Sequence, residues 1–87
     1  MRIHVFISGK VQAVFFRAYL KKNAQKLKLF GWAKNLPDGR VEAVFEGAEK
    51  QIKTIIKLCQ KGSPASRVEK IEVVKEKEEN LNSFKIK

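Results

Sequence analysis

Residues 30–46 read FGWAKNLPDGRVEAVFE, and this stretch decides the fold. Strand-like runs at 30–36 and 40–46 flank Pro37-Asp38-Gly39, a strong turn signal. Two such runs separated by a short turn predict a β-hairpin, because alternation of apolar and polar side chains is typical of a strand with one buried face. In the second run the apolar face consists of Val41, Ala43 and Phe45.

Outward from the hairpin, the sequence predicts a helix and then a strand on each side. Residues 2–8 alternate as a strand, and the stretch 16–27 has apolar residues at helical spacing. On the other side, 48–61 has helical spacing before Gly62, and 68–75 alternates again. A short closing strand can follow at the C-terminal end. The order β-α-β-β-α-β predicts an α+β, ferredoxin-like sandwich, with one antiparallel sheet and two helices on one face.

Length and composition predict one small domain that spans residues 1–87. No apolar run approaches the ~20 residues of a transmembrane helix, and no signal-peptide pattern opens the chain, so no membrane partner is expected. The single cysteine, Cys59, excludes an internal disulfide and is typical of the reducing cytosol. We therefore expect a cytoplasmic protein.

The chain is strongly basic, with 19 Lys and Arg against 9 Asp and Glu and a net charge of +10. Such a surface attracts phosphorylated molecules or nucleic acid. The simpler alternative, favoured by lysines spread along the helix faces, is a solvated surface that supports solubility or heat tolerance. Self-repulsion of the charge predicts a monomer.

Few side chains are available for chemistry. His4, Asp38 and Cys59 are the only residues of their types. No metal site and no Ser-His-Asp or Cys-His set can be assembled from them, and nucleotide-binding fingerprints are absent. An enzyme with this sequence is expected to need no metal or cofactor and to work by positioning and electrostatics.

The junction between the first strand and the first helix is the best candidate for a site. It reads GKVQAVFFR over residues 9–17. A loop that enters a helix presents unpaired backbone N–H groups at the positive end of the helix dipole, which binds anions. Arg17 can add a guanidinium contact to phosphate, although an ordinary loop with a surface arginine remains an alternative. Asn35, before the turn, can orient a water molecule or simply initiate the turn.

These residues resemble the two signatures of the acylphosphatase family, small enzymes that hydrolyse carboxyl–phosphate mixed anhydrides. The first, G-x-V-Q-G-V-x-F-R, corresponds to residues 9–17. The second, G-W/Y-V-x-N-x-x-D-G-x-V-E, corresponds to GWAKNLPDGRVE at 31–42. The Glu46-Gly47 pair and Phe84 also match, so the resemblance covers essentially the whole chain.

The resemblance implies metal-free hydrolysis of acyl phosphates to carboxylate and inorganic phosphate. By matching position, Arg17 binds the phosphate and Asn35 positions the attacking water. The cradle, which is also expected to hold inorganic phosphate or sulfate, is formed by the amides of Val11, Gln12, Ala13, Val14 and Phe15. A carboxylate leaves readily and the phosphate can accept the proton of the water, so fixed N–H donors and a guanidinium do most of the work.

Ala13 departs from the family, which has glycine there. If the position needs φ > 0, alanine costs about 1 kcal/mol or tilts an amide away from the phosphate. One alternative is therefore a catalytically weak domain that only binds phosphate or an acyl phosphate. The other is a basic RNA-binding module of the same fold, but residues 40–46 lack the aromatic pattern of such modules, which disfavours nucleic acid.

The remaining polar residues are expected to be structural. We expect His4 to lie exposed on a sheet face without a partner, and the charged residues 76–79 to form a solvated loop. Glu42 and Glu46 are expected to balance nearby lysines. Cys59 is expected to be buried and inert.

Overall fold

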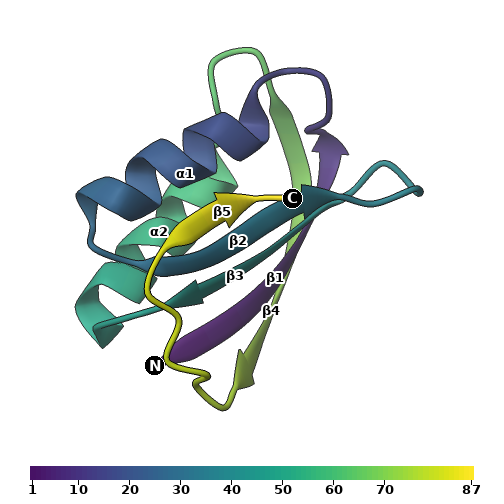
Figure 1. Ribbon diagram of the computed structural model, residues 1–87. Helices are drawn as coiled ribbons and strands as arrows, with labels where there is room; N and C mark the ends of the chain where they lie inside the picture. The colour runs from purple at the N-terminus through teal and green to yellow at the C-terminus, as the bar shows by residue number, and fades with distance from the viewer.

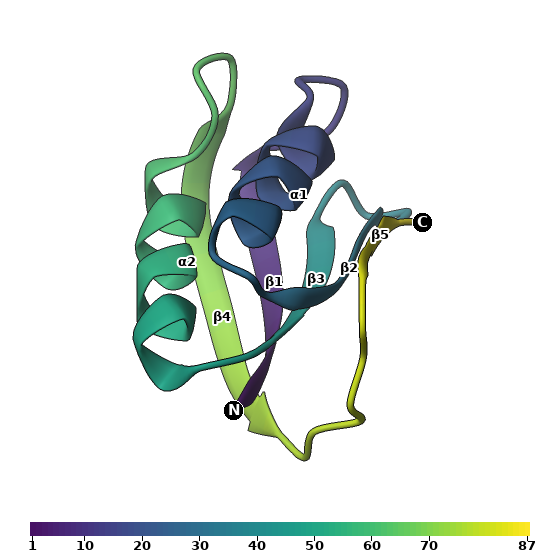
Figure 2. The ribbon, with the colours of Figure 1, turned by 60° about the vertical axis from the view of Figure 1, so that its left-hand side comes forward.

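All the expected elements are present, in the expected order, in the computed structural model, which describes residues 1–87 (Figure 1). Their bounds are β1 (Arg2–Lys10), α1 (Phe16–Lys26), β2 (Phe30–Asn35), β3 (Val41–Glu46), α2 (Glu49–Lys61), β4 (Arg67–Glu76) and β5 (Phe84–Ile86). Both helices lie on the same face of one sheet, as the sequence predicts (Figure 2). Neither helix is long and apolar enough to cross a membrane.

The five strands lie in the order β4-β1-β3-β2-β5. Strand β1 is antiparallel to both β3 and β4, and β2 is antiparallel to β3. Strand β5, however, is parallel to β2, so the sheet is mixed and the expectation of a wholly antiparallel sheet is wrong at this edge. The reason is the connection after β4. It runs past the ends of the strands, at the bottom of Figure 2, and enters β5 from the end where β2 also begins.

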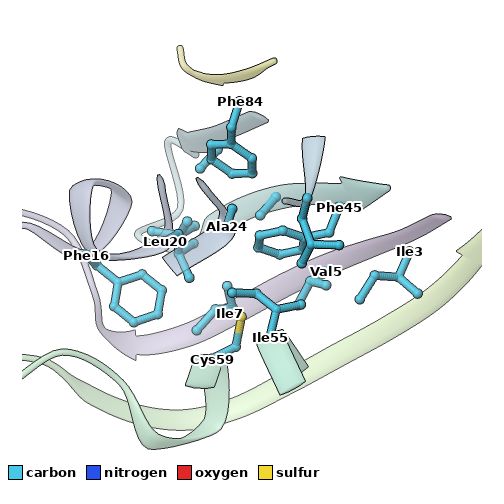
Figure 3. Packing of buried hydrophobic residues seen from close by; sticks show 14 of the residues in the cluster. Ile3, Val5, Ile7, Phe16, Leu20, Ala24, Phe45, Ile55, Cys59 and Phe84 are labelled. Carbon is cyan, nitrogen blue, oxygen red and sulfur yellow. The ribbon is translucent and has the colours of Figure 1, made fainter. Parts of the chain in front are cut away.

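The register of the sheet directs the apolar residues of each strand toward the helices. Ile3 lies opposite Phe45, and Val5 lies opposite Ala43. From the other layer, α1 buries Phe16, Leu20 and Ala24, whereas α2 buries Ile52, Ile55 and Cys59 (Figure 3). Burial raises the pKa of the Cys59 thiol to about 12, which keeps it protonated and agrees with the expectation of an inert cysteine.

The opposite face of the sheet carries ion pairs that the sequence analysis did not predict. His4 is only 19% exposed, and its ring nitrogens lie 2.8 Å from Glu76 Oε2 and 2.6 Å from Glu42 Oε2. Arg2 Nη1 donates to Glu46 Oε2 at 2.8 Å, and Arg2 Nε donates to Glu76 Oε1 at 3.0 Å. We call Arg2, His4, Glu42, Glu46 and Glu76 the open-face network. The expected roles of His4 and Glu46 are therefore wrong, because strand pairing brings their partners from distant sequence.

Glu46 also fixes the connection that leads to β5. Its carboxylate accepts hydrogen bonds from the backbone N–H groups of Glu79, at 2.7 Å, and Leu81, at 2.8 Å. Burial raises the pKa of Glu46, but these N–H groups and Arg2 outweigh it and hold the pKa below its ordinary value of 4.5. The charged segment after β4 is thus tied to the sheet rather than merely solvated.

Candidate functional site

A cleft of about 300 Å³ lies where the N-terminal end of α1 meets the ends of β2 and β5. Its lining residues are Val11, Ala13, Phe15, Phe16, Arg17, Ala18, Asn35 and Ile86. The structure therefore brings Arg17, Asn35 and much of the predicted loop together. Of the predicted loop residues, Gln12 and Val14 do not line the cleft. None of the lining residues is acidic, which suits an anionic ligand.

The glycine that opens the loop is required by close approach of two strands. At Gly9 the pairing of β1 with β4 shifts register. A Cβ atom there would lie 2.1 Å from the main-chain oxygen of Arg67, and φ is +126°. Only glycine fits both conditions, and pairing continues beyond the bulge in a shifted register, Gly9 with Val68 and Lys10 with Arg67.

The loop backbone alternates between left-handed and ordinary conformations. Ala13 and Phe15 both have φ of 60°, whereas Val14 between them has negative φ. Such alternation turns successive N–H groups toward one side and forms an anion-binding concavity. Ala13 therefore has the positive φ at which a cost was expected, because alanine occupies a left-handed position that favours glycine.

No backbone N–H from Gln12 to Ala18 donates a hydrogen bond within the protein. The first N–H of this region that does so belongs to Tyr19, which donates to Phe15 O at 3.0 Å. Seven consecutive unpaired donors exceed the usual number at a helix N-terminus, because the loop adds its own to those of the first helical turn. They form a concentrated set of donors for an anion.

Arg17 lies in the first turn of α1 and is anchored by Lys87, the residue that follows β5. Its Nη1 donates to the main-chain oxygen of Lys87 at 3.1 Å. Lys87 is itself fixed, because its N–H donates to Ala33 O at 2.8 Å. The other N–H groups of the Arg17 guanidinium make no hydrogen bond within the protein and are available to a ligand.

Asn35 is the last residue of β2 and lies on the helix side of the sheet, opposite Val41. Its Oδ1 is buried and has no hydrogen-bond partner. A buried acceptor without a partner is unusual in a folded protein and suits a donor that arrives with the ligand. The turn is held by other groups: Leu36 N–H donates to Arg40 O, and the backbone N–H of Arg40 donates to Asp38 Oδ1.

Gln12 joins the two halves of the site, a role that the sequence analysis did not predict. Its Nε2 donates to Leu36 O at 2.7 Å and to Arg40 O at 2.9 Å. The side chain thus ties the loop to the turn that follows Asn35, while its main-chain N–H belongs to the unpaired set. Ile86 was not predicted either: a closing strand was expected, but no pattern in the sequence places that strand beside β2.

Comparisons with known proteins show the family to which the chain belongs. The family model described as Acylphosphatase matches residues 3–86. A relative named acylphosphatase from Gloeobacter violaceus is 46% identical over 86 residues, which are 99% of this chain and 92% of the relative.

Solved structures give the same result. The acylphosphatase of Bacillus subtilis superimposes with a TM-score of 0.94 at 37% identity, covering 98% of this chain and 96% of that one. The HypF protein of T. kodakarensis matches with a TM-score of 0.86 at 34% identity, covering 100% of this chain but 12% of that one. The fold therefore occurs both as nearly the whole of a small protein and as a small part of a large one.

Proposed function

The chain belongs to the acylphosphatase family, enzymes that act on small acyl phosphates, and we propose that the cleft at the start of α1 is where this chain hydrolyses them to carboxylate and inorganic phosphate. The amides of residues 11–15 and the first turn of α1 hold the transferring phosphoryl group. Arg17 binds the same group through its guanidinium, and Asn35 positions the water. The observation that carries the proposal is that Arg17, the unpartnered Asn35 Oδ1 and the lining residues with unpaired N–H groups meet at one cleft; these residues are Ala13, Phe15, Phe16, Arg17 and Ala18.

The proposed reaction follows from the charges of these groups. One O–H of the water donates a hydrogen bond to Asn35 Oδ1. This contact directs the oxygen atom of the water at phosphorus. The new P–O bond forms as the bond from phosphorus to the carboxyl oxygen breaks, and the carboxylate leaves with the electron pair. The proton of the water passes to a phosphate oxygen. The N–H donors and Arg17 stabilise the charge of the transition state without reorganisation.

The proposal extends to ligand, assembly and location. Inorganic phosphate and sulfate are expected to compete at the loop, since they present the same oxygens to the same donors. We propose a monomer because the net charge of +10 opposes self-association. A cytoplasmic location is supported by the single free cysteine, Cys59, which is buried.

Release of phosphate from benzoyl phosphate, measured with a chelator present, tests the proposed function. The unchanged protein should turn over, and Arg17→Ala should lower kcat by about 10²–10³-fold, because it removes one donor to the transition state. Arg17→Lys should recover only part of the rate, since an ammonium cannot bind in the bidentate manner. Lys22→Ala is the matched control, because it removes an exposed cation from the same helix outside the cleft.

The same measurements separate an enzyme from a binding domain. Phosphate binding without turnover in the unchanged protein would favour the catalytically weak alternative and direct attention to Ala13. If phosphate did not bind and no turnover occurred, the site itself would be misassigned.

A further inference from the structure

Phe15 breaks two local rules at once. It occupies the N-cap position of α1, where a side chain that accepts a hydrogen bond is preferred, and it forms no such bond. Its φ of 60° places an aromatic residue in the left-handed region, which is costly for any residue with a Cβ atom. A strained residue that persists without a structural reason points to a function.

The ring of Phe15 gains no stability from burial, because the residue is 85% exposed. The large side chains of the core are fully buried by comparison; Phe16, the next residue, is 1% exposed. Phe15 nevertheless lines the cleft, together with Ile86, which is 41% exposed on the last strand. An exposed aromatic ring and an exposed branched side chain thus border the same cavity, from elements far apart in the sequence.

The cleft has a polar part and an apolar part. Arg17, Asn35 and the unpaired N–H groups account for its polar part, and six of its eight lining residues are apolar. Its volume of about 300 Å³ is at the lower end of the range for ligand pockets. A cleft of this volume accommodates more than a phosphate and a water. The apolar part therefore has room for a second portion of the substrate.

We infer that Phe15 and Ile86 form the subsite for the acyl group, and that this subsite selects acyl phosphates with aromatic or branched apolar acyl groups. The inference rests on the proposed function. In an acyl phosphate a single oxygen joins phosphorus to the carboxyl carbon, so a phosphoryl group held by the loop places the acyl group beside the residues that border it. Phe15 then contributes its N–H to the phosphate cradle and its ring to the acyl group.

The selectivity of four variants tests the subsite. For each, kcat/KM is measured with benzoyl phosphate and with acetyl phosphate, which differ in the apolar area of the acyl group. Phe15→Ala should lower kcat/KM about tenfold for benzoyl phosphate and less than threefold for acetyl phosphate. Ile86→Ala should act in the same direction, Phe15→Leu should retain most of the preference, and Phe30→Ala, at an exposed phenylalanine outside the cleft, should change nothing.

An equal loss for both substrates would overturn the subsite, because Phe15 would then only hold the loop. The inhibition constant of inorganic phosphate reports on the loop by itself and should stay unchanged in Phe15→Ala. Phe15→Gly adds a second signature: it removes the ring and permits φ > 0, so the preference should disappear while the thermal midpoint does not fall.

Binding of phosphonates separates this inference from the proposed function. Phenylphosphonate and methylphosphonate cannot be hydrolysed at the P–C bond, so their dissociation constants do not require turnover. The unchanged protein should bind phenylphosphonate more tightly, and Phe15→Ala should remove that difference. Absence of turnover with this result would refute the proposed hydrolysis but retain the subsite, whereas equal affinity of the unchanged protein for both probes would refute the subsite.

Discussion

The open-face network and the cleft differ in whether their polar groups have partners within the protein. In the network, the guanidinium of Arg2 and the carboxylate of Glu46 are nearly fully buried and have ionic partners at hydrogen-bond distance. At the cleft and in its loop, the N–H groups of residues 12–18 and the buried Oδ1 of Asn35 have no hydrogen-bond partner, and Ala13 and Phe15 are held in left-handed conformations. The same small chain satisfies its polar groups on one face and leaves them unsatisfied at the end of the sheet.

This difference separates residues that stabilise the fold from residues that we propose act on a ligand. An unpaired buried polar group such as Asn35 Oδ1 costs free energy, and so does a left-handed conformation at a residue with a Cβ atom, so these features of the cleft do not stabilise the fold. Substitutions in the network should therefore change the free energy of unfolding and not the rate. Substitutions in the cleft should do the reverse.

The largest expected effect is on stability, from Glu46→Ala. Removal of this carboxylate leaves Arg2 buried without its closest partner and frees the connection to β5, so the free energy of unfolding should fall by about 3–5 kcal/mol. Chemical denaturation measures the loss, and kcat of the folded fraction should be unchanged. Glu72→Ala is the control, because this exposed residue pairs only with exposed Lys70 and should cost less than about 1 kcal/mol.

Asn35→Ala should produce the opposite pattern. We expect kcat for benzoyl phosphate to fall by about 10²–10³-fold, because the water loses its acceptor. The free energy of unfolding should not fall, since the substitution removes a buried acceptor that has no partner. Asn82→Ala removes an exposed asparagine from the connection to β5 and should leave the rate unchanged. A large loss of stability in Asn35→Ala would mean that the two regions are not separable in this way.

Gln12→Ala should affect both quantities, because Gln12 joins the loop to the turn after Asn35. Loss of its two hydrogen bonds should lower the free energy of unfolding by about 1–2 kcal/mol. The same change should lower kcat/KM by roughly tenfold, since the loop and Asn35 are no longer held together. Kinetics and denaturation on the same sample measure both. An effect on only one of them would show that the tie does not position the site.

Acid should weaken the open-face network. Hydrogen bonds from His4 and Arg2 lower the pKa of Glu76, and the N–H groups of Glu79 and Leu81 with Arg2 lower that of Glu46 despite its burial. A carboxyl group with a lowered folded-state pKa stabilises the protein above its unfolded pKa, about 4.5. This stability is lost as the pH falls below 4.5 and through the folded-state value. Glu46→Gln should therefore flatten the decline in the denaturation midpoint between about pH 5 and pH 3.

The smallest expected effect comes from Ala13→Gly. Glycine removes the left-handed strain at φ of 60° but gains entropy in the unfolded chain, so the free energy of unfolding should rise by no more than about 1 kcal/mol. Turnover or phosphate affinity should rise modestly as the loop amides are freed to align. Identical kinetics in the two proteins would mean that alanine holds the amides as well as glycine does.

The sequence predicted what local patterns encode and missed what strand order creates. Alternation in 2–8 and 40–46 and the Pro-Asp-Gly turn were sufficient for these strands and for the side of the sheet that is buried, and helical spacing in 16–27 and 48–61 was sufficient for the helices. Arg17 and Asn35 could be named because each lies in a recognisable signature. The partners of His4 could not, because Glu42 and Glu76 lie 38 and 72 residues away and only the pairing of β1 with two strands brings them together.

The parallel direction of β5 was missed for a related reason. A strand of three residues carries too little pattern to assign a direction, and that direction depends on the path of the charged connection after β4. Ile86 and the anchor of Arg17 were missed with it. Backbone conformation at Phe15 was also beyond the sequence, because no local preference places phenylalanine in a left-handed position.

The position of β1 between β4 and β3 has a consequence for how the chain reaches its native state. Arg2 bonds to Glu46 and to Glu76, which lie 44 and 74 residues along the chain, so β1 can be completed only after two long loops have closed. Closure of such loops costs entropy before any contact compensates for it, which places folding among the slower small domains, on the order of milliseconds to seconds. The cleft needs the start of α1, the end of β2 and the last strand together. The proposed site is therefore complete only when all these elements are in place, and we expect recovery of turnover after dilution from denaturant to report the final step of folding.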